Sequence, residues 1–134
     1  MFKIEHIGIA VKNIEQSNDL FTKLFGKAPY KLEKVESEGV STSFFLIGDN
    51  KIELLEATDS SSPIAKFIEK KGEGIHHICF RVSDVRKVSD DLRAKGFRLL
   101  YENPVIGARN CLVNFIHPQS ANGVLIEILE KQTP

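Results

Sequence analysis

The sequence predicts an α+β fold in which two similar βαβββ modules are related by pseudo-twofold symmetry. Three observations predict it: an early repeat, a late repeat, and one pattern of a helix followed by strands in each half. In the early repeat, residues 4–14 match residues 75–85 at a shift of 71, which aligns His6 with His77. A strand-like segment therefore opens each half of the chain.

The late repeat closes each half. Residues 52–56 match residues 126–130 at a shift of 74, which aligns Glu53 with Glu127. Because both matches occur in the same order, the chain contains a duplicated unit of roughly 65–70 residues, which is longer than a solenoid repeat.

The first module is expected over about residues 4–57. Apolar and polar residues alternate over 4–11, as in a half-buried strand. Asn13 can cap a helix, with Gln16 in the capping-box position, and Gly26 stands where that helix stops. Three strand-like runs follow, at about residues 30–36, 40–48 and 51–57.

A linker helix and a second module complete the expected single domain of residues 1–134. The linker helix is predicted at about 62–71, where Pro63 favours the first turn. The second module is expected over about 75–130, with Asp84 as its helix cap. Its strands are predicted at about 98–102, 111–117 and 123–130.

Composition excludes several classes of protein. Eighteen basic and eighteen acidic residues give a formal net charge of zero, whereas a nucleic-acid-binding protein usually has a basic excess. No apolar run approaches the length of a membrane span. Only Cys79 and Cys111 occur, without a CxxC motif, which indicates a reducing compartment and a cytoplasmic location.

Four polar residues are expected on one side of the sheets. Successive side chains of a strand alternate between its faces, so His6 and His77 oppose the apolar residues that meet the helices. Glu53 and Glu127 lie opposite apolar neighbours in the same way. The mixed sheets are therefore expected to form an open, barrel-like metal cleft. Imidazole and carboxylate together suit one divalent ion of cobalt, zinc, manganese, nickel or iron.

Other interpretations of these side chains remain open. A single histidine in a strand is usually a surface residue or a hydrogen-bonded core residue, and it is the duplication that favours metal ligands. Glu53 is either the fourth ligand, a carboxylate behind the ligands, or a base. His76 points to the other face and is expected either to be structural or to lie behind the ligands. Glu56 and Glu130 are expected to be solvated or interface charges.

The sequence resembles the vicinal-oxygen-chelate superfamily, and within it the methylmalonyl-CoA epimerases along almost its whole length. The superfamily also includes glyoxalase I, extradiol dioxygenases, and proteins of fosfomycin and bleomycin resistance. The more specific matching runs are residues 62–67, 72–78, and His117-Pro118 followed by 123–127; residues 6–11 and 51–56 also match. The resemblance implies metal ligands at His6, His77 and Glu127, with Glu53 at the fourth ligand position.

Two positions depart from the pattern of the family. Some epimerases carry a glutamate three positions after the glycine of a Gly-Val pair, where this chain has Thr42. The loop around Arg109 lacks a histidine that many members carry. Thr42 and Arg109 are candidate substrate-binding residues, although a solvated surface role fits Arg109 equally well.

The resemblance implies an epimerase that moves the C2 proton of an acyl-CoA substrate through an enolate, without a redox cofactor. Glu53 and Glu127 are the candidate acid and base, and Glu53 is the favoured base. A homodimer is expected from the family. The alternatives are a glyoxalase I-like lyase, which acts on a glutathione hemithioacetal, and a metal-free protein that sequesters a ligand. The two His–Glu pairs argue against the metal-free protein.

Overall fold

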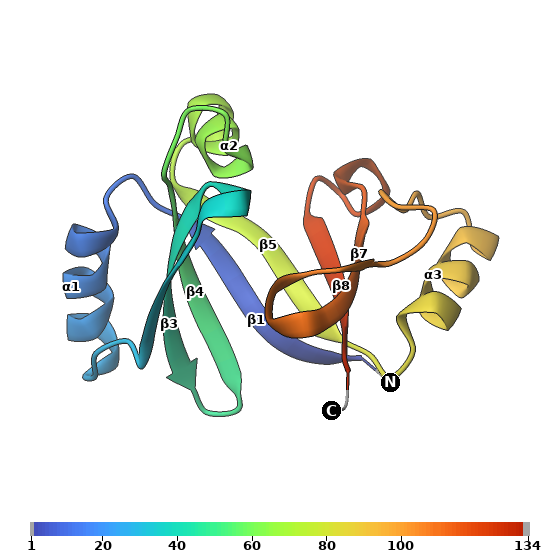
Figure 1. The fold of residues 1–134 in the computed structure, drawn as a ribbon, viewed down its shortest axis with the longest axis horizontal. Helices are drawn as coiled ribbons and strands as arrows, with labels where there is room; N and C mark the ends of the chain where they lie inside the picture. The colour runs from blue at the N-terminus through green and yellow to red at the C-terminus, as the bar shows by residue number, and fades with distance from the viewer. Residues whose placement is uncertain (1, 133–134) are drawn as a thin grey trace. The chain divides into compact units, whose positions relative to one another are not determined.

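A computed structural model describes residues 2–132 and contains the elements of two βαβββ modules in the predicted order (Figure 1). The first module and the linker helix comprise β1 Lys3–Ala10, α1 Ile14–Phe25, β2 Lys31–Val35, β3 Val40–Ile47, β4 Asn50–Ala57 and α2 Pro63–Lys71. The second module comprises β5 Gly74–Arg81, α3 Val85–Ala94, β6 Val105–Ile106, β7 Cys111–Ile116 and β8 Leu125–Lys131. The predicted mixed α+β class is confirmed.

Two compact units make up the chain, and their boundary differs from that of the modules. The N-terminal unit is His6–His76. The C-terminal unit contains the described residues from His77 onward and also those up to Glu5. Each unit therefore includes part of β1 and part of β5, the two middle strands in the order β2-β3-β4-β1-β5-β8-β7-β6.

In the N-terminal unit, β1 runs parallel to β4, and β3 runs antiparallel to both β2 and β4. Helix α1 begins after Asn13, whose side chain accepts a hydrogen bond from the Gln16 amide at 3.0 Å, and it ends at Gly26. It covers a core that includes Phe45 and Leu54. Helix α2 packs on a different group, which includes Leu55. Leu54 and Leu55 point to opposite faces of β4, so α1 and α2 cover different faces of this strand. Glu53, two residues before Leu55, lies on the same face as Leu55.

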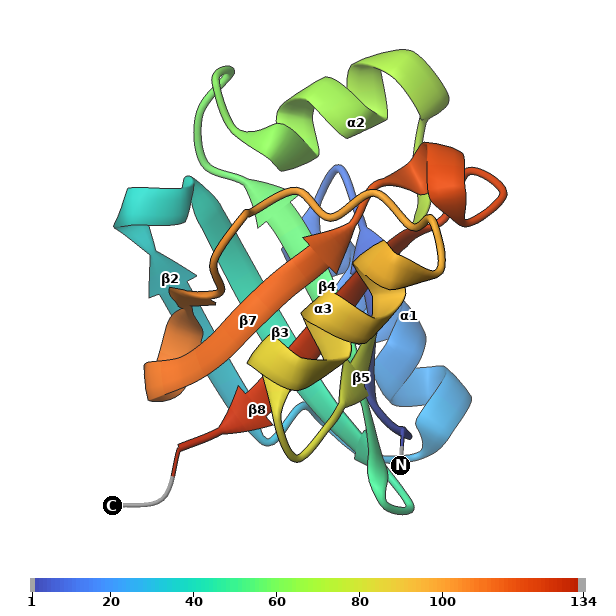
Figure 2. The ribbon, with the colours of Figure 1, turned by 90° about the vertical axis from the view of Figure 1, so that its right-hand side faces the viewer.

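The C-terminal unit repeats this arrangement. Strand β5 runs parallel to β8, and β7 runs antiparallel to both β8 and β6. The Asp84 side chain caps α3 by accepting from the Lys87 amide at 3.0 Å. Figure 2 shows α3 against the strands of this unit, where it covers a core that includes Leu112 and Ile128.

The predicted strand at 98–102 is wrong. Within this range only Leu99 forms an isolated bridge, to Ile116, and the strands that pair with β7 are β6 and β8. The Asn114 side chain explains the difference, because it accepts from the Tyr101 amide and donates to the Tyr101 carbonyl, both at 3.1 Å. A side chain thus satisfies backbone groups that a neighbouring strand would otherwise satisfy.

Candidate metal centre and active site

One histidine and one glutamate meet in the N-terminal unit. The parallel register of β1 and β4 places Gly8 beside Glu53, and His6 shares the face of Gly8. The Nδ1 atom of His6 lies 3.2 Å from Oε2 of Glu53, and the two side chains are only 4% and 7% exposed. Because a buried carboxylate needs a compensating partner, this pair is an organised polar site and not a pair of solvated surface groups.

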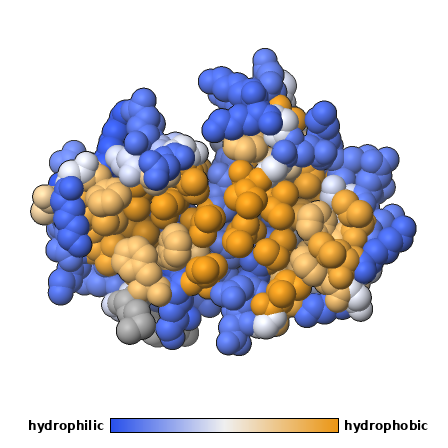
Figure 3. All heavy atoms as spheres, turned by 180° about the vertical axis from the view of Figure 1, so that it is seen from behind, coloured by the Kyte–Doolittle hydropathy of each residue, from blue (hydrophilic) through white to orange (hydrophobic). Residues whose placement is uncertain are grey.

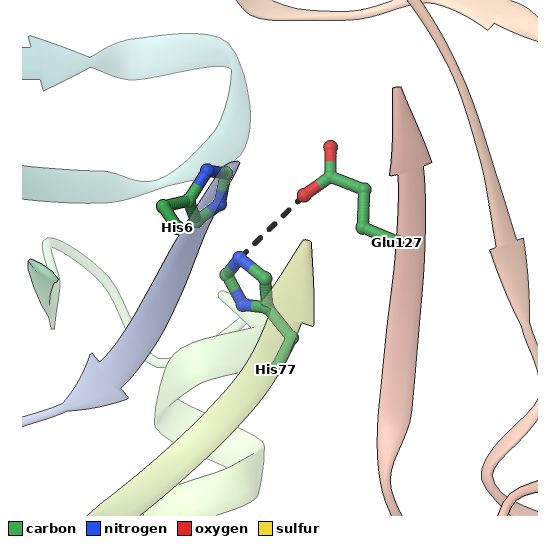
Figure 4. A group of neighbouring side chains, drawn as sticks. All are labelled: His6, His77 and Glu127. Carbon is green, nitrogen blue, oxygen red and sulfur yellow. Dashed lines mark ion pairs between the residues drawn. The ribbon is translucent and has the colours of Figure 1, made fainter. Parts of the chain in front are cut away.

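An equivalent pair occurs in the C-terminal unit. The register of β5 and β8 places Cys79 beside Glu127, and His77 shares the face of Cys79. The Nε2 atom of His77 lies 3.5 Å from Oε1 of Glu127, and the side chains are 11% and 14% exposed. Figure 4 shows the His77 ring on β5 turned toward the carboxylate of Glu127 on β8, with a dashed line marking the ion pair. Each unit thus supplies one imidazole and one carboxylate.

The donor chemistry of the two pairs fits a divalent cation. Neutral imidazole nitrogens and carboxylate oxygens are the ligands that zinc, cobalt, manganese, nickel and iron share. In metal sites a ligating histidine commonly contacts a carboxylate, which orients the ring and raises its basicity. The buried contacts His6–Glu53 and His77–Glu127 are compatible with such a site.

Thr42 lies on the same face as Glu53. Across β3 and β4, Thr42 is opposite Leu55, and the next pair on that face is Phe44 with Glu53. Thr42 is buried. The strand therefore presents a hydroxyl group diagonally across from the Glu53 carboxylate.

The register of β2 and β3 adds a residue that the sequence analysis missed. Glu33 is the cross-strand partner of Thr42, and its Oε2 lies 3.2 Å from Nζ of Lys31. The hydrophobic pattern of β2 does not predict which face Glu33 occupies, because no residue of that strand is buried.

Arg109 lies in the C-terminal unit, in a short 3-10 helix, Ala108–Asn110, just before β7. Its φ of 56° is in the left-handed region, which a side-chain-bearing residue rarely adopts. The adjacent Asn110 has a φ of 55°. This backbone places the Arg109 guanidinium on a tight turn and not on a strand.

The neighbouring polar residues have structural roles. His76 packs edge-on against Phe67 with ring centroids 5.0 Å apart, which agrees with the structural role expected for it. Glu130 differs from its expected role as a solvated or interface charge, because its Oε1 accepts from the Val85 amide at 2.9 Å. The helix dipole stabilises a negatively charged group at the first turn of α3. Cys79 and Cys111 are both buried, and they do not form a disulfide.

A family model described as the Glyoxalase/Bleomycin resistance protein/Dioxygenase superfamily matches residues 5–115. The chain belongs to this superfamily. Within it, the chain is 39% identical over 130 residues to the mitochondrial methylmalonyl-CoA epimerase of Dictyostelium discoideum, covering 96% of this chain and 78% of the relative. It is 36% identical over 128 residues to an ethylmalonyl-CoA/methylmalonyl-CoA epimerase of Cereibacter sphaeroides, covering 94% and 96%.

Solved structures agree with these relatives. The methylmalonyl-CoA epimerase of Mycobacterium tuberculosis superimposes with a TM-score of 0.87 at 35% identity, covering 97% of this chain and 88% of that one. A methylmalonyl-CoA epimerase in complex with methylmalonyl-CoA and NH4+ gives a TM-score of 0.90 at 32% identity, covering 99% and 96%. The resemblance to methylmalonyl-CoA epimerases is confirmed in both sequence and fold. Across residues 2–132, no helix has the length and apolar character needed to cross a membrane.

Proposed function

We propose that this protein interconverts the (2R) and (2S) epimers of methylmalonyl-CoA by moving the proton at C2. One observation carries the proposal: each unit holds a buried His–Glu pair at equivalent positions, in a chain homologous to methylmalonyl-CoA epimerases over nearly its full length. An epimerase needs polar groups held in place beside an acidic C–H bond, and paired strands supply that rigidity.

The proposed ligands of one divalent ion are His6, His77 and Glu127, with Glu53 as the fourth. The ion would be cobalt, zinc, manganese, nickel or iron. When bound, it supplies positive charge beside the thioester oxygen, where negative charge develops as C2 loses its proton. The residues themselves orient the substrate and exclude water, which their burial favours. No redox cofactor is required, because the reaction only moves a proton.

Glu53 is the proposed base that takes the C2 proton. Its side chain is 7% exposed and lies on the face that also presents Thr42. Glu127 occupies the equivalent position and is the alternative acid or base. A carboxylate held by a cation is a weaker base, because the cation stabilises its ionised form. Of the two carboxylates, we propose Glu53, at the fourth ligand position, as the base.

Two further residues are proposed to bind substrate. The Arg109 guanidinium can pair with a phosphate or the malonyl carboxylate of an acyl-CoA. The Thr42 hydroxyl can contact the acyl group next to Glu53. The proposal also includes a cytoplasmic homodimer. Support for self-association comes from large exposed apolar side chains, and Figure 3 shows apolar residues over much of one face.

The decisive experiment follows deuterium entry at C2 of each methylmalonyl-CoA epimer in D2O, together with inversion. The metal-loaded protein is expected to catalyse both, and Glu53→Gln is expected to lose about 100-fold or more in rate. Glu36→Gln is the matched control, since Glu36 is exposed and pairs only with Lys34 among the contacts described.

Two other outcomes would contradict the proposal. Turnover of a glutathione hemithioacetal without exchange at C2 would identify a glyoxalase I-like lyase. Tight binding of a ligand without metal or turnover would identify a sequestering protein. Full activity of Glu53→Gln with metal retained would remove Glu53 from the role of base.

A further inference from the structure

We infer that Phe115 limits the size of the alkyl group that a substrate can carry at C2, and that Tyr101 holds the Phe115 ring in place. The inference rests on the proposed function, in which the acyl group lies beside Glu127. It goes further because it names the wall that the alkyl group meets. Among the carbon substituents of C2, the alkyl group is the one without a polar atom, so it gains most from an apolar surface.

An apolar lining adjoins Glu127 in the C-terminal unit. Figure 4 shows the Glu127 side chain extending from β8 toward His77. Cys79 is directly opposite Glu127 on β5, and Phe115 is directly opposite it on β7. Phe115 packs against a cluster of buried residues on this face, which consists of Cys79, Cys111, Val113 and Leu129. The carboxylate therefore stands at the edge of an apolar surface that one unit supplies alone.

Phe115 is the part of this lining that a substrate can reach. The four clustered residues are at most 7% exposed, whereas Phe115 is only partly buried. Directly opposed residues of an antiparallel pair have Cβ atoms about 4.5–5.5 Å apart. Leu125 is also partly buried on this face, but it lies two residues from Glu127 along β8, which is about 6.4–6.8 Å. An alkyl group beside the Glu127 carboxylate therefore meets the Phe115 ring first.

Tyr101 restrains the Phe115 ring. The two rings pack edge to face, with centroids 6.0 Å apart and an interplanar angle of 76°. The amide of Leu100, the residue before Tyr101, donates to the Phe115 carbonyl at 2.8 Å, which ties the two backbones together. Aromatic pairs of this geometry are favourable beyond the area that they bury. The Phe115 ring is therefore held against rotation away from the substrate.

The backbone of Tyr101 is fixed by two further side chains. Asn114 bonds both the amide and the carbonyl of Tyr101, each at 3.1 Å. The Arg93 guanidinium on α3 donates to the carbonyls of Tyr101 and Glu102. Extra methylenes are costly where packed side chains cannot move aside. The wall formed by Phe115 and Tyr101 therefore disfavours an alkyl group longer than the methyl group of the proposed substrate.

The test compares kcat/KM for epimerisation of ethylmalonyl-CoA, which is longer by one methylene, with that of methylmalonyl-CoA. The wild type is expected to favour methylmalonyl-CoA. Phe115→Leu is expected to raise the ethyl-to-methyl ratio about 10-fold or more, because one methylene in an apolar pocket changes kcat/KM about 10- to 200-fold. Tyr101→Leu should raise the ratio by a smaller factor, whereas Tyr101→Phe retains the ring and should keep the wild-type ratio.

Phe80→Leu is the matched control for loss of a phenyl ring. Phe80 lies in the same unit and is opposite Ile128, in the core beneath α3, so its loss should lower stability without changing the ratio. Thermal unfolding measures the stability of each variant. If Phe115→Leu does not fold, Tyr101→Leu decides, since Tyr101 is 38% exposed.

Three results would overturn the inference: equal kcat/KM of the wild type for both substrates, a wild-type ratio in the folded variant that decides, or an equal shift in Phe80→Leu. Failure of the wild type to exchange the C2 proton of either substrate would instead contradict the proposed function.

Discussion

Ser89 and Asn114 are hydrogen-bonded in the core of the C-terminal unit. The Asn114 amide donates to the Ser89 hydroxyl at 3.1 Å, and both residues are fully buried. The equivalent positions in the first module, at a shift of 71, carry the same two residue types exchanged, with Asn18 on the helix and Ser43 on the strand. Among the described residues, Asn18 Oδ1 and Ser43 Oγ are buried without a hydrogen-bond partner. One module satisfies this polar pair and the other does not.

Asn114→Ala is therefore expected to lower the free energy of unfolding by about 3 kcal/mol, because it removes the partner of the buried Ser89 hydroxyl and of the part-buried backbone groups of Tyr101. Ser43→Ala removes a buried hydroxyl without a partner and is expected to change stability by less than about 0.5 kcal/mol, or to increase it. Urea unfolding of both variants measures the difference. Equal losses would contradict the assigned hydrogen bonds.

Alanine substitutions at two glycines distinguish the stability cost of backbone strain from that of steric crowding. Gly39 has a φ of 64°, and an added Cβ would meet Asp59 Oδ2 at 3.0 Å and Ser62 Cβ at 3.2 Å. Gly26 has a φ of 75° with nothing within 4 Å. Gly26→Ala is expected to cost about 1 kcal/mol from the left-handed backbone alone, and Gly39→Ala about 1 kcal/mol more. The midpoints of thermal unfolding of the two variants measure this difference. A smaller loss of stability for Gly39→Ala than for Gly26→Ala would contradict steric crowding at Gly39.

The histidine doublet gives a matched test of metal binding. His77→Ala is expected to weaken binding of Co²⁺ or Zn²⁺ by about 100-fold or more, because it removes a proposed ligand. His76→Ala should bind metal nearly as well as the wild type, since His76 packs against Phe67. Calorimetric titration measures both affinities. In the wild type, metal at about 100 times its dissociation constant should add about 2.7 kcal/mol of stability. Equal affinities in the two variants would argue against His77 as a ligand.

Asp59 should titrate below the ordinary range of an aspartate. Its carboxylate accepts hydrogen bonds from the hydroxyl and the backbone amide of Ser61, which lower the Asp59 pKa below 3.8. Because the folded-state pKa is the lower one, the stabilisation is present above the unfolded pKa and is lost as pH falls through the folded pKa. A carbon-detected NMR titration measures the midpoint. Ser61→Ala should raise it, and an unchanged midpoint would contradict the hydrogen-bonding cause.

The faces of His6 and Glu53 could be predicted because strand side chains alternate with a period of two, and their apolar neighbours fix which face meets the helix. The irregular course of residues 98–102 could not, because it depends on the Asn114 side chain. Glu33 was missed for a related reason. Its pairing with Thr42 depends on the turn at Glu36–Glu38 and Gly39, and a shift of one residue would turn Glu33 to the other face.

Residues 2–5 belong to the C-terminal unit, where the Phe2 and Phe80 rings lie 5.8 Å apart and Glu5 lies 4.0 Å from Lys131. The C-terminal half of the chain is therefore not expected to fold as a self-sufficient fragment. A polypeptide starting at His77 would lack the strand segment that its own sheet borrows from the far end of the chain. The C-terminal half, expressed separately, should therefore gain order when the N-terminal half that carries this segment is added.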